Sequence, residues 1–136
     1  MGNFFIEGIP APQGSKTGRV VNGRVVMWES SAKVKPWRAA VTTMTKAHMQ
    51  FGDLEMITEP IELCLSFYMP RPKSVKREFP SVKPDLDKLI RSTCDGLKTG
   101  GLYTDDALII ALTATKQYAP VGMESGCHVL VVREYV

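Results

Sequence analysis

Residues 83–107 read KPDLDKLIRSTCDGLKTGGLYTDDA. Apolar residues recur at helical spacing from Leu86 to Leu97, and two glycines follow at positions 100 and 101. This pattern predicts a helix from about Asp85 or Leu86 to Lys98. The apolar, β-branched run from 107 to 118 predicts a strand directly afterwards. The stretch is therefore a helix–turn–strand unit with aspartates at both of its junctions.

The rest of the chain divides into short elements of both kinds. Strands are expected over 3–9, 61–69 and 127–135, with loops over 14–19 and 70–84. Asn22-Gly23 between β-branched runs predicts a type I′ hairpin over 20–26. A helix capped by Ser30 or Ser31 is expected over 32–50, with its apolar face formed by Trp37, Ala40, Val41, Met44, Ala47 and His48. Two helices and five or six strands make an α+β fold with a mixed β-sheet, in a single domain over 1–136.

The composition is that of an ordinary globular protein. Hydrophobic residues make up 44% and charged residues 23% of the 136 positions, close to the usual shares. No run approaches the roughly 20 apolar residues of a membrane helix, and the first residues do not read as a signal peptide. The three cysteines, at 64, 94 and 127, form no CxxC pair. We therefore expect no zinc, no disulfides, no membrane, and a cytoplasmic location.

The positive charge is unevenly distributed along the chain. The net charge is only +3, yet residues 1–50 carry seven basic and two acidic groups, and residues 70–91 carry seven and three. Such clustering favours a polyanionic partner. Solvated lysines on a soluble surface explain the same charges equally well.

The aspartates of residues 83–95 have an ordinary explanation. Asp85 falls at or just before the cap of the predicted helix and Asp87 in its first turn, where carboxylates accept backbone N–H bonds and complement the helix dipole. Asp87, Arg91 and Asp95 are spaced four residues apart on one face, which suits two ion pairs along the helix. We prefer that interpretation for Asp95.

Asp105 and Asp106 are harder to explain structurally. Adjacent carboxylates at the entrance to an apolar strand repel each other and gain nothing from a helix dipole. If they lie near Asp85 and Asp87, a cation is needed to offset the charge. Oxygen-only ligands suit Mg²⁺, or Mn²⁺, and magnesium activates water for phosphodiester cleavage. The sequence does not show that the two acidic segments meet.

These residues together resemble a known family. The pattern Lys83-Pro84-Asp85-x-Asp87-x-Leu89, then Asp95-x-Leu97, Gly101, Asp105-Asp106 and Lys116, resembles the RusA family of Holliday-junction resolvases. The resemblance implies a homodimer that binds four-way DNA junctions and nicks opposed strands with Mg²⁺, in a bacterial, prophage or phage setting. By position, Asp85, Asp87 and Asp106 match the essential carboxylates, with Asp105 beside them.

Two positions depart from the family pattern. Arg91 stands where a catalytic lysine is usual; it keeps the charge but not the compact ammonium head. Lys88 stands where Asn is usual. The leading hypothesis is a Mg²⁺-dependent structure-selective endonuclease in DNA recombination and repair, with Arg91 as electrostatic helper. Phosphate contacts are then expected from Lys16, Arg19, Arg71, Lys73, Lys76, Arg77, Lys83, Lys88 and Lys116.

Other interpretations stay open at this point. A catalytically silent branched-DNA-binding protein with the same fold would keep the charges and lose the chemistry. A metal-dependent phosphotransferase or phosphatase that uses Asp85 and Asp87 as nucleophile and acid/base pair is a third hypothesis. Lys116 lies about 33 Å along a straight strand from Asp106, so we assign it to DNA contact or structure. Phe79 and Tyr103 are candidates for base stacking, although core packing explains both more simply.

Overall fold

Strand β4 (Ile61–Met69) lies inside a four-stranded sheet whose order is β1-β6-β4-β5. Its residues alternate between buried and half-buried along its length, as expected for a strand with one covered face. β5 (Ile109–Tyr118) pairs with it in parallel, and β6 (Gly126–Glu134) pairs antiparallel with both β4 and β1 (Asn3–Glu7). The predicted mixed sheet is confirmed. This computed structural model describes residues 2–13, 16–29 and 33–136.

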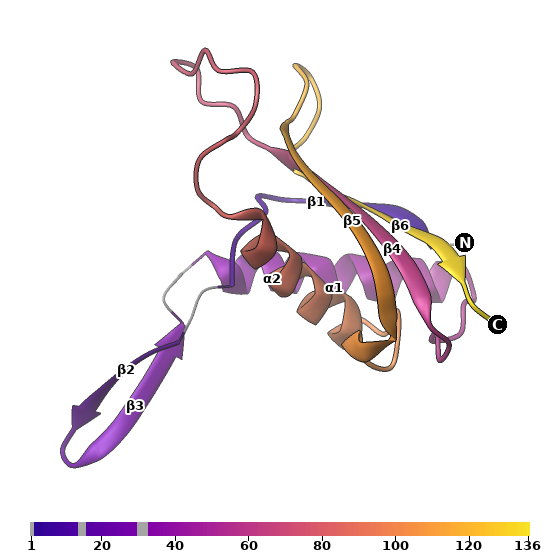
Figure 1. Cartoon of the computed structure of the whole chain (residues 1–136), viewed down its shortest axis with the longest axis horizontal. Coiled ribbons are helices and arrows are strands. Elements are labelled where there is room, and N and C mark those ends of the chain that lie inside the picture. Colours follow the sequence, from indigo (N-terminus) through magenta and orange to yellow (C-terminus); the bar gives the residue numbers. More distant parts are fainter. Residues whose placement is uncertain (1, 14–15, 30–32) are drawn as a thin grey trace.

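Two helices cover one face of this sheet (Figure 1). α1 (Val34–Phe51) and α2 (Leu86–Thr99) pack on each other, and the Nε1–H of Trp37 donates to Thr93 Oγ1 at 3.0 Å across their buried contact. The core lies between helices and sheet, and its fully buried side chains include Ile6, Leu63, Leu65, Phe67, Leu89, Leu97 and Val129. The domain is thus built of two layers, one of helices and one of sheet, with the core between them.

The predicted local elements are largely confirmed. α2 ends at Thr99 and is followed by Gly100 and by Gly101 at φ +90°. β2 (Lys16–Val21) and β3 (Arg24–Glu29) form the predicted hairpin, and Asn22 and Gly23 both have positive φ, as a type I′ turn requires. The expected loop over 14–19 is wrong from Lys16 onward, because those residues pair with β3.

The first helix differs from its prediction in two respects. It begins at Val34, two residues later than expected, and Lys33 is its cap without a side-chain hydrogen bond. The expected cap at Ser30 or Ser31 lies outside the described residues. Met44 is 39% exposed, so it does not belong to the buried face, whereas Thr45 does. The buried Thr45 hydroxyl donates to the Val41 carbonyl at 2.7 Å, which is why a polar residue is tolerated there.

Candidate active site

The segment that enters α2 presents two exposed aspartates. Asp85 is the N-cap of the helix, with extended backbone, but its carboxylate makes no capping hydrogen bond. It forms instead an exposed ion pair with Lys88, with 3.7 Å between Oδ2 and Nζ. Asp87 lies in the first turn and is exposed. The capping explanation therefore accounts for the position of Asp85 and not for its carboxylate.

Asp105 has a structural role that the sequence did not suggest. A short 3₁₀ helix, η1 (Asp106–Leu108), precedes β5, and Asp105 is its cap: Oδ1 accepts a hydrogen bond from Ala107 N at 2.9 Å. The expectation that this carboxylate gains nothing from a helix terminus is wrong, because one turn of 3₁₀ helix is enough to offer a free N–H. The capping bond gives the Asp105 carboxylate a structural role through Oδ1.

Asp106 is the unusual carboxylate. Its Oδ1 is buried and has no hydrogen-bond partner. The carboxylate lies close to the side chains of Tyr103 and Cys94, and burial, with Asp106 nearby, raises the pKa of both, that of Cys94 to about 11. The single phenolic proton of Tyr103 is already donated to the Cys94 carbonyl at 2.9 Å. An unsatisfied buried oxygen is costly, and a cation or a water is the group that would satisfy it.

Asp85 and Asp87 lie at the start of α2, whereas Asp106 lies in η1, so these carboxylates do not converge. Asp87 is in the first turn of α2, and Asp106 approaches Cys94 in the third. Seven residues at about 1.5 Å each separate those two levels by about 10 Å along the axis. Asp85 caps the N-terminus of α2, and Figure 1 shows the chain leading into β5 near the opposite end of this helix. In the described ranges, no three His, Cys, Asp or Glu side chains are close enough together to hold a metal ion.

Arg91 lies on α2 between these two levels. It follows Asp87 by four residues and precedes Cys94 by three, and it is exposed. The ion pairs expected along this helix are not formed: within the described part of the chain, no pair joins Arg91 to a carboxylate. Asp95 pairs instead with Arg38 of α1, at 3.8 Å. The guanidinium of Arg91 is therefore placed where it can approach an anion bound beside the helix.

A cationic cleft adjoins the start of α2. Its volume is about 340 Å³, and its lining includes Lys33, Arg77, Lys83 and Lys116 but no acidic residue. Six prolines make up much of its wall: Pro10, Pro12, Pro70, Pro72, Pro80 and Pro84. Lys33 was not among the predicted site residues, because it is distant in sequence and joins the other three only in the folded chain. Pro84, the residue before Asp85, is part of the wall.

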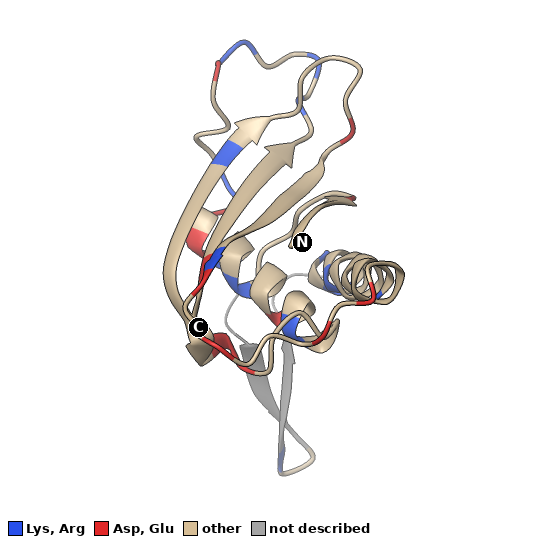
Figure 2. Ribbon diagram, turned by 90° about the vertical axis from the view of Figure 1, so that its right-hand side faces the viewer, with Lys and Arg blue, Asp and Glu red and all other residues tan. Residues whose placement is uncertain are grey.

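The basic loop over 70–84 carries most of the predicted DNA contacts. Figure 2 shows its lysines and arginines along the arch above the sheet, and Lys73, Lys76, Arg77 and Lys83 are exposed. Arg71 is engaged within the loop: its guanidinium donates to the carbonyls of Val75, Arg77 and Glu78 and stacks on Tyr118 at 4.3 Å. Lys16 and Arg19 belong to β2, and their side chains lie outside what the structure describes.

The two candidate stacking residues separate. Tyr103 is completely buried, which confirms core packing, whereas Phe79 is 61% exposed, so core packing is wrong for it. Phe79 lies on the wall of an open groove with residues of the 119–125 turn. It stays a candidate for contact with an unpaired base.

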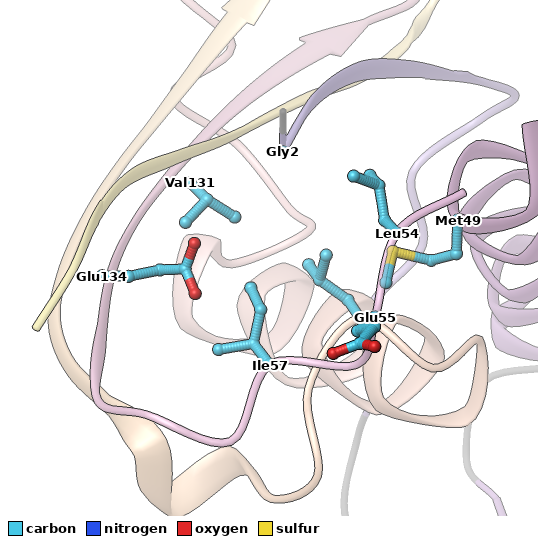
Figure 3. A pocket seen from close by; sticks show the side chains of 8 residues that line it. Gly2, Met49, Leu54, Glu55, Ile57, Val131 and Glu134 are labelled. Carbon is cyan, nitrogen blue, oxygen red and sulfur yellow. The ribbon is translucent and has the colours of Figure 1, made fainter. Parts of the chain in front are cut away.

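A small apolar cavity on the other side of the domain contains none of the predicted site residues. Figure 3 shows its lining from β6, the end of α1 and the segment after it, including Met49, Leu54, Ile57 and Val131. Its volume is about 160 Å³, and its ionisable groups are the carboxylates of Glu55 and Glu134. This cavity therefore lacks the basic side chains that line the cleft before α2.

The fold and site together define a small α+β protein with exposed carboxylates at the start of α2, directly after a residue that lines a cleft with four basic side chains. The family model described as endodeoxyribonuclease RusA matches residues 7–124, and the chain belongs to the RusA endodeoxyribonuclease family. Its relatives include the uncharacterized protein YqaN of Bacillus subtilis (strain 168), which is 30% identical over 128 residues that span 85% of this chain and 87% of that protein. No helix in the described ranges is long and apolar enough to cross a membrane.

Proposed function

We propose that this protein is a divalent-metal-dependent, structure-selective endonuclease that resolves four-way DNA junctions as a homodimer. One observation carries the proposal: the exposed carboxylates of Asp85 and Asp87 follow directly after Pro84, which lines a cleft with four basic residues and no acidic one. A phosphodiester strand lying in that cleft would bring a phosphate beside carboxylates. Membership in an endodeoxyribonuclease family supports the same chemistry.

The proposed metal ligands are Asp85, Asp87 and Asp106. Asp105 is the less favoured ligand, because its Oδ1 already accepts a hydrogen bond from Ala107 N. All offer oxygen, the donor that Mg²⁺ prefers, and the unpartnered Oδ1 of Asp106 is a free acceptor. Bound magnesium would activate water and neutralise charge on the phosphate. Asp87 and Asp106 are separated along the axis of α2. A single ion shared by both carboxylates would require them to move closer together, whereas two separate ions would not.

The remaining roles are electrostatic. Arg91, between the two acidic levels, would stabilise negative charge that develops on the attacked phosphate. Lys33, Arg77 and Lys83 would hold the strand by its phosphates without reading sequence. Phe79 would contact a base left unstacked at the branch point.

Cleavage of a synthetic four-way junction tests the proposal. Wild-type protein should nick the junction with Mg²⁺ and stop in EDTA, and Asp87→Asn should lower the rate roughly 100-fold or more. Asp95→Asn is the matched control, because it makes the same change on the same helix at a carboxylate paired with Arg38. Full activity of Asp87→Asn would remove the proposed site.

A second candidate function is junction binding without cleavage. Two observations favour it: Lys88 occupies the carboxylate of Asp85, and no three possible metal ligands converge in the described chain. It predicts a stable junction complex in a gel-shift assay and intact strands at every Mg²⁺ or Mn²⁺ concentration. The same cleavage gel therefore separates the two functions.

A further inference from the structure

Lys116 ties the sheet to the segment that presents Asp85. Its Nζ donates to the carbonyl oxygens of Val82 and Pro84, both at 2.8 Å. In the parallel pair of β4 and β5, Lys116 lies opposite Phe67, which is fully buried. Lys116 therefore projects from the helix-covered side of the sheet, at the end of β5 remote from Asp106.

The two carbonyls that accept these hydrogen bonds belong to a segment without helix or strand. Residues 70–85 run from β4 to α2 without regular structure, and four of them are prolines, which donate no N–H. Arg71 holds the distal half of this segment through the carbonyls of Val75, Arg77 and Glu78. Lys116 holds the half that enters the helix.

The position of the Pro84 carbonyl bears directly on Asp85. The Pro84 carbonyl and the Asp85 N–H belong to one planar peptide unit, so a bond that fixes the carbonyl also fixes where Asp85 begins. On its other side, the Asp85 carbonyl accepts from Leu89 N at 3.1 Å, which anchors it to α2. The Asp85 side chain makes no capping bond that would orient the residue. The backbone of Asp85 is thus held from the sheet by Lys116 and from the helix by Leu89.

We propose that Lys116 is a positioning residue that sets the location of Asp85, and not primarily a DNA contact. An ammonium has three donors, and two of them are used within the protein. Bonds from a charged donor are stronger than neutral ones, so the tie restrains the segment. The expected effect of Lys116 on cleavage rests on the proposed nuclease function. The hydrogen bonds from Lys116 to Val82 and Pro84 do not, because they are a property of the free protein.

Lys116→Met tests the tie, since methionine keeps much of the aliphatic stem and removes every donor. Hydrogen exchange of the free protein should become faster at the amides of residues 81–89 and stay unchanged in β4 and β6. Lys116→Arg, which keeps charge and donors, should restore part of the protection. Lys46→Met, at an exposed lysine of α1, should change neither. Unchanged exchange at 81–89 in Lys116→Met would overturn the proposal.

Activity and binding separate positioning from DNA contact. Misplacement of Asp85 should lower the cleavage rate of Lys116→Met roughly 10- to 100-fold, raise the Mn²⁺ concentration needed for half-maximal binding to the free protein, and leave junction affinity within about twofold. Loss of a phosphate contact would instead weaken junction binding and reduce its salt slope by about one, which would overturn the proposal. If the wild-type protein cuts no junction, the proposed function fails, while the exchange and Mn²⁺ measurements still decide the role of Lys116.

Discussion

Asp85 and Lys88 form an ion pair one helical turn apart, with 3.7 Å between the carboxylate Oδ2 and the ammonium Nζ. Both side chains are about half exposed, at 51% and 44%, so the pair contributes at most about 1 kcal/mol. It nevertheless occupies the carboxylate that is proposed to hold a metal ion. Lys88 would therefore compete with the proposed cation at this position.

Lys88→Asn should strengthen metal binding. Removing the competing charge should lower the Mn²⁺ dissociation constant of the free protein roughly two- to fivefold, the range that about 1 kcal/mol allows. Titration calorimetry or the paramagnetic resonance signal of free Mn²⁺ measures this directly. Lys35→Asn, at an exposed lysine of α1, is the control. Unchanged or weaker binding by Lys88→Asn would show that Lys88 does not compete with the metal.

Asp106→Asn should stabilise the metal-free protein and abolish cleavage. The carboxylate keeps a buried oxygen without a partner, and a neutral amide removes that unpaired charge, so the free energy of unfolding in EDTA should rise by about 1 kcal/mol. Urea denaturation measures it. Asp105→Asn is the matched control, because asparagine also caps and the Ala107 bond is kept. A destabilised Asp106→Asn would mean that the carboxylate is satisfied in the folded protein.

Gly96→Ala should destabilise the protein although it lies inside a helix, where alanine is normally the better residue by about 1 kcal/mol. An added Cβ would lie 2.7 Å from Val41 Cβ of the facing helix, and overpacking of this kind costs about 2 kcal/mol. Thermal and urea unfolding measure the loss. The double variant with Val41→Ala should lose less than the sum of the two single changes; strict additivity would contradict the proposed contact.

Acidification should weaken the fold through His48. Its ring stacks on Phe4, with centroids 4.3 Å apart, and burial lowers the pKa of the imidazole from 6.5. Between the folded and unfolded pKa values, His48 is protonated in the unfolded chain but not in the folded chain. The free energy of unfolding therefore falls as the pH drops below about 6.5, until the pKa of the folded state is reached. His48→Gln removes this dependence.

The measurement is the difference in midpoint temperature between wild type and His48→Gln at pH 7.5 and pH 5.5. The wild type should lose more on acidification than the variant does. Carboxylates titrate in both proteins and cancel in the comparison. An equal loss in the two proteins would show that His48 is protonated as readily in the folded state as in the unfolded state.

The sequence by itself determined the local elements and the kind of chemistry. The limits of α2 followed from apolar spacing and a glycine stop, and the hairpin from Asn22-Gly23, because these signals act over a few neighbouring residues. The resemblance carried by residues 83–116 indicated the family before any coordinates. The sequence did not determine the role of each aspartate: Asp85 lies at the predicted cap but makes no capping bond, while Asp105, which was predicted beside the metal ligands, makes one.

Only the tertiary structure decided which distant groups meet. β6 pairs between β1 and β4, Lys33 joins the cationic cleft, and Lys116 reaches the carbonyl before Asp85 across 32 residues of chain. Such contacts depend on strand order, which leaves no periodic signal in the sequence; alternation along a strand indicates only which of its own residues share a face. Strand length correctly placed Lys116 far from Asp106, but only the parallel pairing of β4 with β5 brought it to the entrance of α2.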